Sequence, residues 1–182
     1  MAELSERIKT SLAAQEQYLN LHLQGLKRAG ANLAGVLARG NKLLTLGCPT
    51  VAQHMVAELT GRFVQERPGL PAIFIGENAS AVTSILNDYG RDRIYARQLM
   101  ALANRGDFVL GFMAGVDHAA QDGIELAQRE GLETLVLEIP GAEEWVAVEI
   151  FLTAAHILTE EVEAELRRTQ PDWFPAPAVV KA

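Results

Sequence analysis

Two histidines and one glutamate are the residues of this chain best suited to chemistry. His54 and Glu58 lie four residues apart in VAQHMVAELTGR, a stretch that predicts a helix, so their side chains share one helical face. An imidazole and a carboxylate can bind zinc or act as an acid–base pair. The alternative is a solvent-exposed face on which Glu58 pairs with Arg62. On spacing alone, the exposed face is the favoured interpretation.

The second histidine, His156, lies on the last helix that the pattern predicts, over residues 145–168. A polar stripe follows this helix at steps of three and four residues: Glu149, Thr153, His156, Glu160, Glu163 and Arg167. Apolar residues cover its other side. A histidine on such a stripe is usually solvated, so the spacing by itself predicts no site here.

Two turns lie where a phosphate would bind, because ligands of parallel α/β sheets bind at the carboxyl ends of the strands. The first turn, residues 47–50, reads Gly-Cys-Pro-Thr, and its proline lacks an N–H donor. Its Thr50 is a predicted N-cap. In the second turn, residues 113–118, the Asp117 carboxylate would repel phosphate but makes a good N-cap. Both turns are better suited to starting helices than to binding an anion.

Strand and helix patterns alternate along the chain. Short apolar runs predict strands at residues 42–47, 72–75, 107–113 and 133–139. Helical periodicity predicts helices over residues 51–65, 80–86, 93–103, 117–129 and 145–168, with a break at 87–90. The alternation predicts an α/β fold, a doubly wound parallel sheet flanked by helices on both faces. We expect one domain over residues 1–170, followed by an extended, proline-rich tail over 171–182.

Residues 1–40 predict a helical segment used in oligomerisation. Apolar side chains recur at helical spacing from Leu4 to about residue 29, and a weaker helix follows over 31–39. So long a helix has more apolar face than one neighbour can cover. It either packs against another subunit or lies along the core of its own chain.

Composition excludes several classes of function. The net charge of −7 argues against direct nucleic-acid binding. Cys48 is the one cysteine, so no intramolecular disulfide can form, and we expect a cytoplasmic protein. The sequence has no signal-peptide pattern and no apolar stretch of roughly 20 residues, so we expect no membrane association.

The chain resembles the sugar isomerase (SIS) domain family, especially its phosphoheptose isomerase and DiaA-like members. The resemblance is strongest over residues 54–75 and 87–112, where His-x-x-x-Glu-Leu-Thr-Gly-Arg is followed by Glu-Arg-Pro. It implies a flavodoxin-like three-layer fold and a homotetramer. It also implies a sugar phosphate ligand or a protein partner, such as a replication initiator.

The resemblance also assigns roles to individual residues. It implies zinc ligands at His54, Glu58 and His156, while Val148 replaces a glutamine that ligates zinc in the family. It implies that the Glu58 carboxylate moves a proton between C1 and C2 of a sugar, with His156 as the complementary acid or base. The expected substrate contacts are Thr50, Arg62, Asn87 and Asp88.

The phosphate loops depart from the family pattern. Residues 47–50 are a shortened form of the family's Gly-Asn-Gly-Gly-Ser loop, and residues 113–118 replace Ser-Thr-Ser-Gly-Asn-Ser. Trp145 lies near the place of a sugar-contacting aspartate. We therefore expect a weakened or non-catalytic homologue that serves as a sugar-phosphate-binding or protein-binding scaffold. The alternatives are an active sedoheptulose 7-phosphate isomerase that uses Glu58 and His156, and a structural metal site without catalysis.

Overall fold

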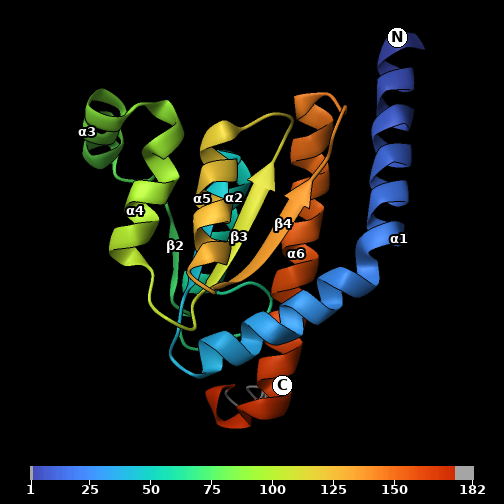
Figure 1. The fold of residues 1–182 in the computed structure, drawn as a ribbon. Helices are drawn as coiled ribbons and strands as arrows, with labels where there is room; N and C mark the ends of the chain where they lie inside the picture. The colour runs from blue at the N-terminus through green and yellow to red at the C-terminus, as the bar shows by residue number, and fades with distance from the viewer. Residues whose placement is uncertain (1, 175–182) are drawn as a thin grey trace.

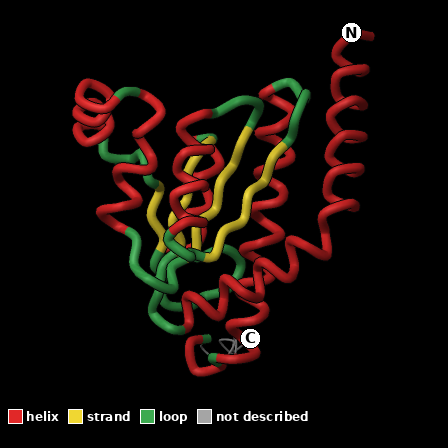
Figure 2. The backbone as a smooth tube through the Cα atoms, viewed as in Figure 1, coloured by secondary structure: helices red, strands yellow, loops and turns green. Residues whose placement is uncertain are grey.

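A four-stranded parallel sheet forms the centre of the molecule in a computed structural model that describes residues 2–174. The strands are β1 (Leu43–Gly47), β2 (Ala72–Phe74), β3 (Phe108–Met113) and β4 (Glu133–Glu138), arranged in the order β2-β1-β3-β4. Every neighbouring pair is parallel. Figure 2 shows the strands in yellow at the centre of the molecule. The parallel sheet and the places of its four strands are as predicted from the sequence.

Helices cover both faces of the sheet and give three layers (Figure 1). On one face, α2 (Pro49–Thr60) packs beside α6 (Glu144–Thr169); on the other, α4 (Ile94–Leu102) packs beside α5 (His118–Arg129). The strand order places β1 and β3 in the middle, and all residues of both strands are buried. The predicted doubly wound arrangement is confirmed.

The first helix, α1 (Ala2–Ala38), packs along α6 and bends part of the way along its length (Figure 1). The sequence predicted a weaker helix after residue 30, and the structure has one continuous helix there. A Cβ atom on Gly30 would lie 2.6 Å from the Cβ atom of Glu161 on α6, so the glycine permits close packing of the two helices. That packing compensates for the poor helix propensity of glycine.

The carboxyl ends of β1 and β3 meet without a gap. A Cβ atom on Gly47 would lie 2.2 Å from the carbonyl oxygen of Phe112, and the Gly47 backbone has φ of 88°. The next N–H group, of Cys48, donates to the same Phe112 carbonyl over 2.8 Å. The first backbone N–H after β1, at the edge of the sheet where α/β proteins bind ligands, is therefore already bonded to β3.

Two helices end several residues away from the end that the sequence predicted. Helix α2 ends at Thr60 instead of residue 65, because the chain from 61 to 70 turns around the buried Arg67 side chain. Helix α3 (Ala79–Tyr89) continues through the predicted break and ends at Gly90, whose φ is 85°.

At the C-terminal end, Pro171–Trp173 form a short 3-10 helix where extended chain was predicted, and residues 175–182 lie outside the described chain. None of the helices within residues 2–174 combines the length and the apolar character needed to cross a membrane.

Candidate metal and acid–base site

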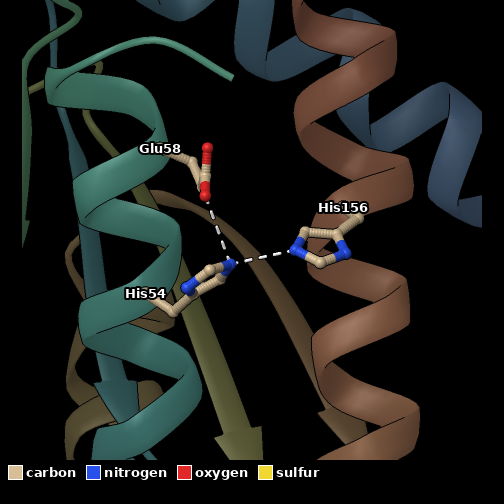
Figure 3. A group of neighbouring side chains, drawn as sticks. All are labelled: His54, Glu58 and His156. Carbon is tan, nitrogen blue, oxygen red and sulfur yellow. Dashed lines mark hydrogen bonds and ion pairs between the residues drawn. The ribbon is translucent and has the colours of Figure 1, made fainter. Parts of the chain in front are cut away.

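The packing of α2 against α6 brings His54, Glu58 and His156 together (Figure 3). The Nε2 atom of His54 lies 2.9 Å from Nε2 of His156 and 3.4 Å from Oε1 of Glu58. The sequence spacing had favoured a solvated face, and the resemblance had favoured a shared site. The structure brings the three residues into one group.

Burial explains why α2 presents these two residues to α6. Val51, Met55 and Leu59 form the buried side of α2, which leaves the side with His54 and Glu58 partly exposed. Across from them, the Phe63 ring stacks on the His156 ring with centroids 5.3 Å apart and an angle of 26°. The aromatic contact restricts the rotation of the His156 imidazole.

The three side chains form a donor set suited to zinc. One ligand atom from each residue can be chosen so that all three lie within 4.8 Å of one another. Two imidazole nitrogens and a carboxylate oxygen are typical zinc ligands. Two ring nitrogens 2.9 Å apart form at most one hydrogen bond with each other, whereas a cation between the rings could bind both.

A fourth ligand from Val148 is impossible, since its side chain has no donor atom. A zinc ion on the three residues would keep an open coordination position. Three protein ligands with an open position are typical of catalytic zinc, whereas structural zinc sites usually have four.

Thr50 is not the N-cap that the sequence predicted, and Arg62 pairs with Glu66; their expected contacts with substrate stay predictions. The N-cap of α2 is Cys48, with no side-chain hydrogen bond, and Pro49 begins the helix, so Thr50 lies in the first turn and is not the cap. Arg62 lies beyond the end of α2, and its Nε atom is 3.9 Å from Glu66. The predicted Glu58–Arg62 pair is absent from the ion pairs of the described chain, in which Glu58 faces His54.

The other two expected substrate contacts, Asn87 and Asp88, lie on α3. Both are exposed, and Asp88 accepts a hydrogen bond from Ser84 over 3.5 Å. Helices α3 and α6 lie on opposite sides of the molecule (Figure 1). Within one chain, these two residues are therefore not brought to His156, and their role stays a prediction.

At the second turn, Asp117 is the N-cap of α5, as predicted, and accepts a hydrogen bond from the Ala120 N–H over 3.0 Å. Nearby, the Tyr95 hydroxyl donates to the Gly47 carbonyl over 3.1 Å. Burial, together with the negative charge of Asp117, raises the pKa of Tyr95 to about 12. One backbone N–H beside each turn, of Cys48 and of Ala120, is thus bonded within the protein, and the Asp117 carboxylate lies at the second turn.

Sequence analysis missed a buried ion pair, Arg67 with Glu163. The Nε atom of Arg67 donates to Glu163 Oε1 over 3.0 Å, and the exposed fractions of the two side chains are 0% and 2%. Glu163 had been placed on a polar stripe of the last helix. Two features of the sequence could have indicated the pair. Glu163 lies seven residues after His156, two helical turns along the same face, and Arg67 belongs to the Glu-Arg-Pro motif.

The chain is similar to known proteins of one family. The SIS domain family matches residues 8–138. The phosphoheptose isomerase of Geobacter sp. (strain M21) is 36% identical over 88% of this chain and 96% of its own length. That of Thermodesulfovibrio yellowstonii is 30% identical over 88% of this chain and 92% of its own length.

A solved structure, of phosphoheptose isomerase from Neisseria gonorrhoeae, superposes with a TM-score of 0.81 over 90% of this chain and 98% of the other, at 19% identity. A likeness at that identity shows the shared fold. The sequence matches go further: this chain belongs to the SIS domain family.

Proposed function

We propose that this chain is an aldose–ketose isomerase of the phosphoheptose isomerase type, with a weakened phosphate site. One observation carries the proposal: Nε2 of His54 on α2 lies 2.9 Å from Nε2 of His156 on α6 and 3.4 Å from Oε1 of Glu58. A scaffold that only binds other proteins has no need for an acid–base group assembled from two helices.

The chemistry follows from what an isomerisation requires. A proton leaves one carbon of the sugar and arrives at its neighbour, and a second proton moves between the two oxygens, by way of an enediol. In this proposal the Glu58 carboxylate takes and returns the carbon-bound proton, and the His156 imidazole transfers the proton at oxygen. When bound by the three residues, zinc would supply Lewis acidity that polarises a carbonyl oxygen.

Sedoheptulose 7-phosphate is the first substrate to test, because the relatives at 30% and 36% identity are named phosphoheptose isomerases. We expect weak binding of its phosphate, since the Cys48 N–H is already bonded and the Asp117 carboxylate lies at the second turn. Remote binding energy of this kind also supports the chemical step, so turnover should be slow.

A second candidate function is a scaffold that binds a sugar phosphate or a protein, such as a replication initiator, without catalysis. The bonded Cys48 N–H at the first turn and the Asp117 carboxylate at the second turn favour it. One experiment separates the two candidates: isomerisation of sedoheptulose 7-phosphate by the wild type, by Glu58→Gln and by Glu66→Gln.

The two substitutions make the same chemical change at different places. Glu58 belongs to the proposed site, whereas Glu66 is exposed and pairs with Arg62. We expect kcat/KM to fall by about 10²–10⁴ for Glu58→Gln, the range typical of a lost general base, and to stay unchanged for Glu66→Gln. No activity in the wild type, or full activity in Glu58→Gln, would exclude the isomerase proposal.

We also propose a homotetramer that associates through α1. The apolar residues Leu4, Ile8 and Leu12 are 60–62% exposed, and they line a pocket of about 490 Å³ with Trp145 of α6. An apolar helix face exposed to this extent is typical of an interface. A cytoplasmic setting is part of the same proposal and is supported by the single cysteine.

A further inference from the structure

A buried charge cluster joins the end of α2 to α6 directly beside the candidate site. The Arg67 guanidinium donates through Nη2 to the carbonyl of Glu58 over 3.0 Å and through Nη1 to the carbonyl of Leu59 over 2.9 Å. The last carbonyls of a helix lack partners within the helix, and a cation there is favourable. Arg67 thus holds the turn of α2 that carries Glu58.

Glu163 makes the matching contacts from the side of α6. Besides its bond to Arg67, its carboxylate accepts hydrogen bonds from the backbone N–H groups of Phe63, Val64 and Gln65, each over 3.2 Å. The segment that follows α2 is therefore fixed to α6 by one carboxylate. Glu163 and His156 are seven residues apart, so they share a face of α6.

Phe63 extends this set of contacts to the site. Its N–H group is held by Glu163, and its ring stacks on the ring of His156. The same carboxylate that anchors the chain after α2 therefore also places the aromatic ring that packs on the histidine.

We infer that Arg67 and Glu163 are positioning residues for the site: together they set the spacing of α2 and α6 at which His54, Glu58 and His156 can bind one cation. Only the part of this inference that concerns zinc binding rests on the proposed function. Some residues contact and orient the metal ligands without binding the metal themselves. Removing such a residue typically weakens metal affinity by about tenfold to a hundredfold. A purely structural ion pair would change stability and leave the affinity of the folded protein for zinc unchanged.

The test compares Glu163→Gln and Arg67→Lys with Ile124→Ala. Glu163→Gln keeps the size of the side chain and Arg67→Lys keeps its charge, but both lose the geometry of the ion pair. Ile124 lies on α5, on the other face of the sheet, and is 6% exposed, so its truncation lowers stability through a cavity remote from the site. Zinc affinity is measured by competition with a chelator at a temperature where each variant is folded.

A second readout needs neither zinc nor activity. The chain has four histidines, so imidazole nitrogen signals in ¹⁵N NMR spectra can be assigned by substituting each in turn. The 2.9 Å contact should give His54 and His156 signals distinct from those of exposed histidines. We expect Glu163→Gln and Arg67→Lys to make these signals resemble those of exposed histidines and to weaken zinc binding about tenfold or more.

Ile124→Ala should leave both readouts unchanged in the folded protein. Wild-type histidine signals in the two positioning variants would overturn the inference, as would an equal change in Ile124→Ala. If Glu163→Gln fails to fold, Arg67→Lys decides by the same criteria. If the wild type binds no zinc, the metal part of the proposed function fails, and the histidine signals still decide the positioning role.

Discussion

The Nε2 atoms of His54 and His156 lie 2.9 Å apart although the residues are separated by 102 positions in the sequence. Two neutral imidazoles in contact form at most one hydrogen bond, whereas a cation can bind both nitrogens and the Glu58 carboxylate at once.

We expect the wild-type protein to retain about one zinc per chain after dialysis, as three protein ligands of this type would allow. His54→Ala and His156→Ala should each lose most of it, because two remaining ligands hold zinc weakly. Metal analysis of the dialysed proteins measures the outcome. His22→Ala is the control, since His22 packs on Tyr18 with ring centroids 4.3 Å apart. Equal zinc contents in all four proteins would contradict the prediction.

The two turns at the sheet edge differ in how they start their helices. Asp117 accepts a hydrogen bond at the N-terminus of α5, whereas Thr50 makes no cap bond on α2. Asp117→Ala should therefore lower the free energy of unfolding by about 1 kcal/mol, and Thr50→Ala should change it by less than about 0.5 kcal/mol. Urea titration of the two variants compares them directly, and equal losses would show that the caps were assigned wrongly.

Asp107, buried where β3 begins, predicts a loss of stability in acid. Its carboxylate accepts hydrogen bonds from the backbone N–H groups of Lys42, over 3.0 Å, and Asn104, over 2.7 Å, and from the Lys42 ammonium group. Burial raises the pKa of Asp107, but the hydrogen bonds from Lys42, Asn104 and Asn41 together outweigh burial and hold it below its usual value. The folded state therefore favours the ionised carboxylate.

A pKa that is lower in the folded state stabilises the protein above the unfolded value of about 3.9, and the contribution is lost as the pH falls through the folded value. At pH 7 we expect Asp107→Asn to cost about 2 kcal/mol. The difference from wild type should shrink below pH about 4, where the wild-type carboxylate takes up a proton. Unfolding at a series of pH values measures it. The exposed Asp92→Asn should show no such trend, and a difference that does not depend on pH would refute the assignment.

The exposed apolar stripe of α1 predicts the assembly state. Ile8→Ser combined with Leu12→Ser should convert the proposed tetramer into smaller species, because both side chains are about 60% exposed in one chain. Leu21 is 77% exposed but points away from that stripe in helical register, so Leu21→Ser is the control. Light scattering after gel filtration reports the mass. A monomeric wild type, or a double variant that stays tetrameric, would exclude α1 as the interface.

The sequence predicted the strands well, because apolar residues follow one another directly in each of them. The four strands are short apolar runs, and the structure has a strand within each of them. The sequence predicted a weaker helix after residue 30, where the structure has one continuous helix; α6 packs against Gly30, and such a contact is invisible in local sequence. The Arg67–Glu163 pair was missed for the same reason, since the sequence shows the charges but not that they are buried.

The contacts within the site were also not predictable from local sequence. Helical spacing put His54 beside Glu58, but it carried no information on which helix would lie opposite them. The family resemblance supplied His156, and the packing of α2 on α6 shows the distance. Asn87 and Asp88 came from the resemblance as well, and one chain alone leaves them on the other side of the molecule.

The two helices that form the site, α2 and α6, are synthesised at different times. The segment with His54 and Glu58 leaves the ribosome long before residues 144–169, so a nascent chain carries two of the three ligands without the third. Contacts between segments so distant in sequence form late, after the cost of closing a long loop has been met. Uptake of a cation would thus report that the final helix has docked, and a chain stalled before α6 would be unable to acquire one.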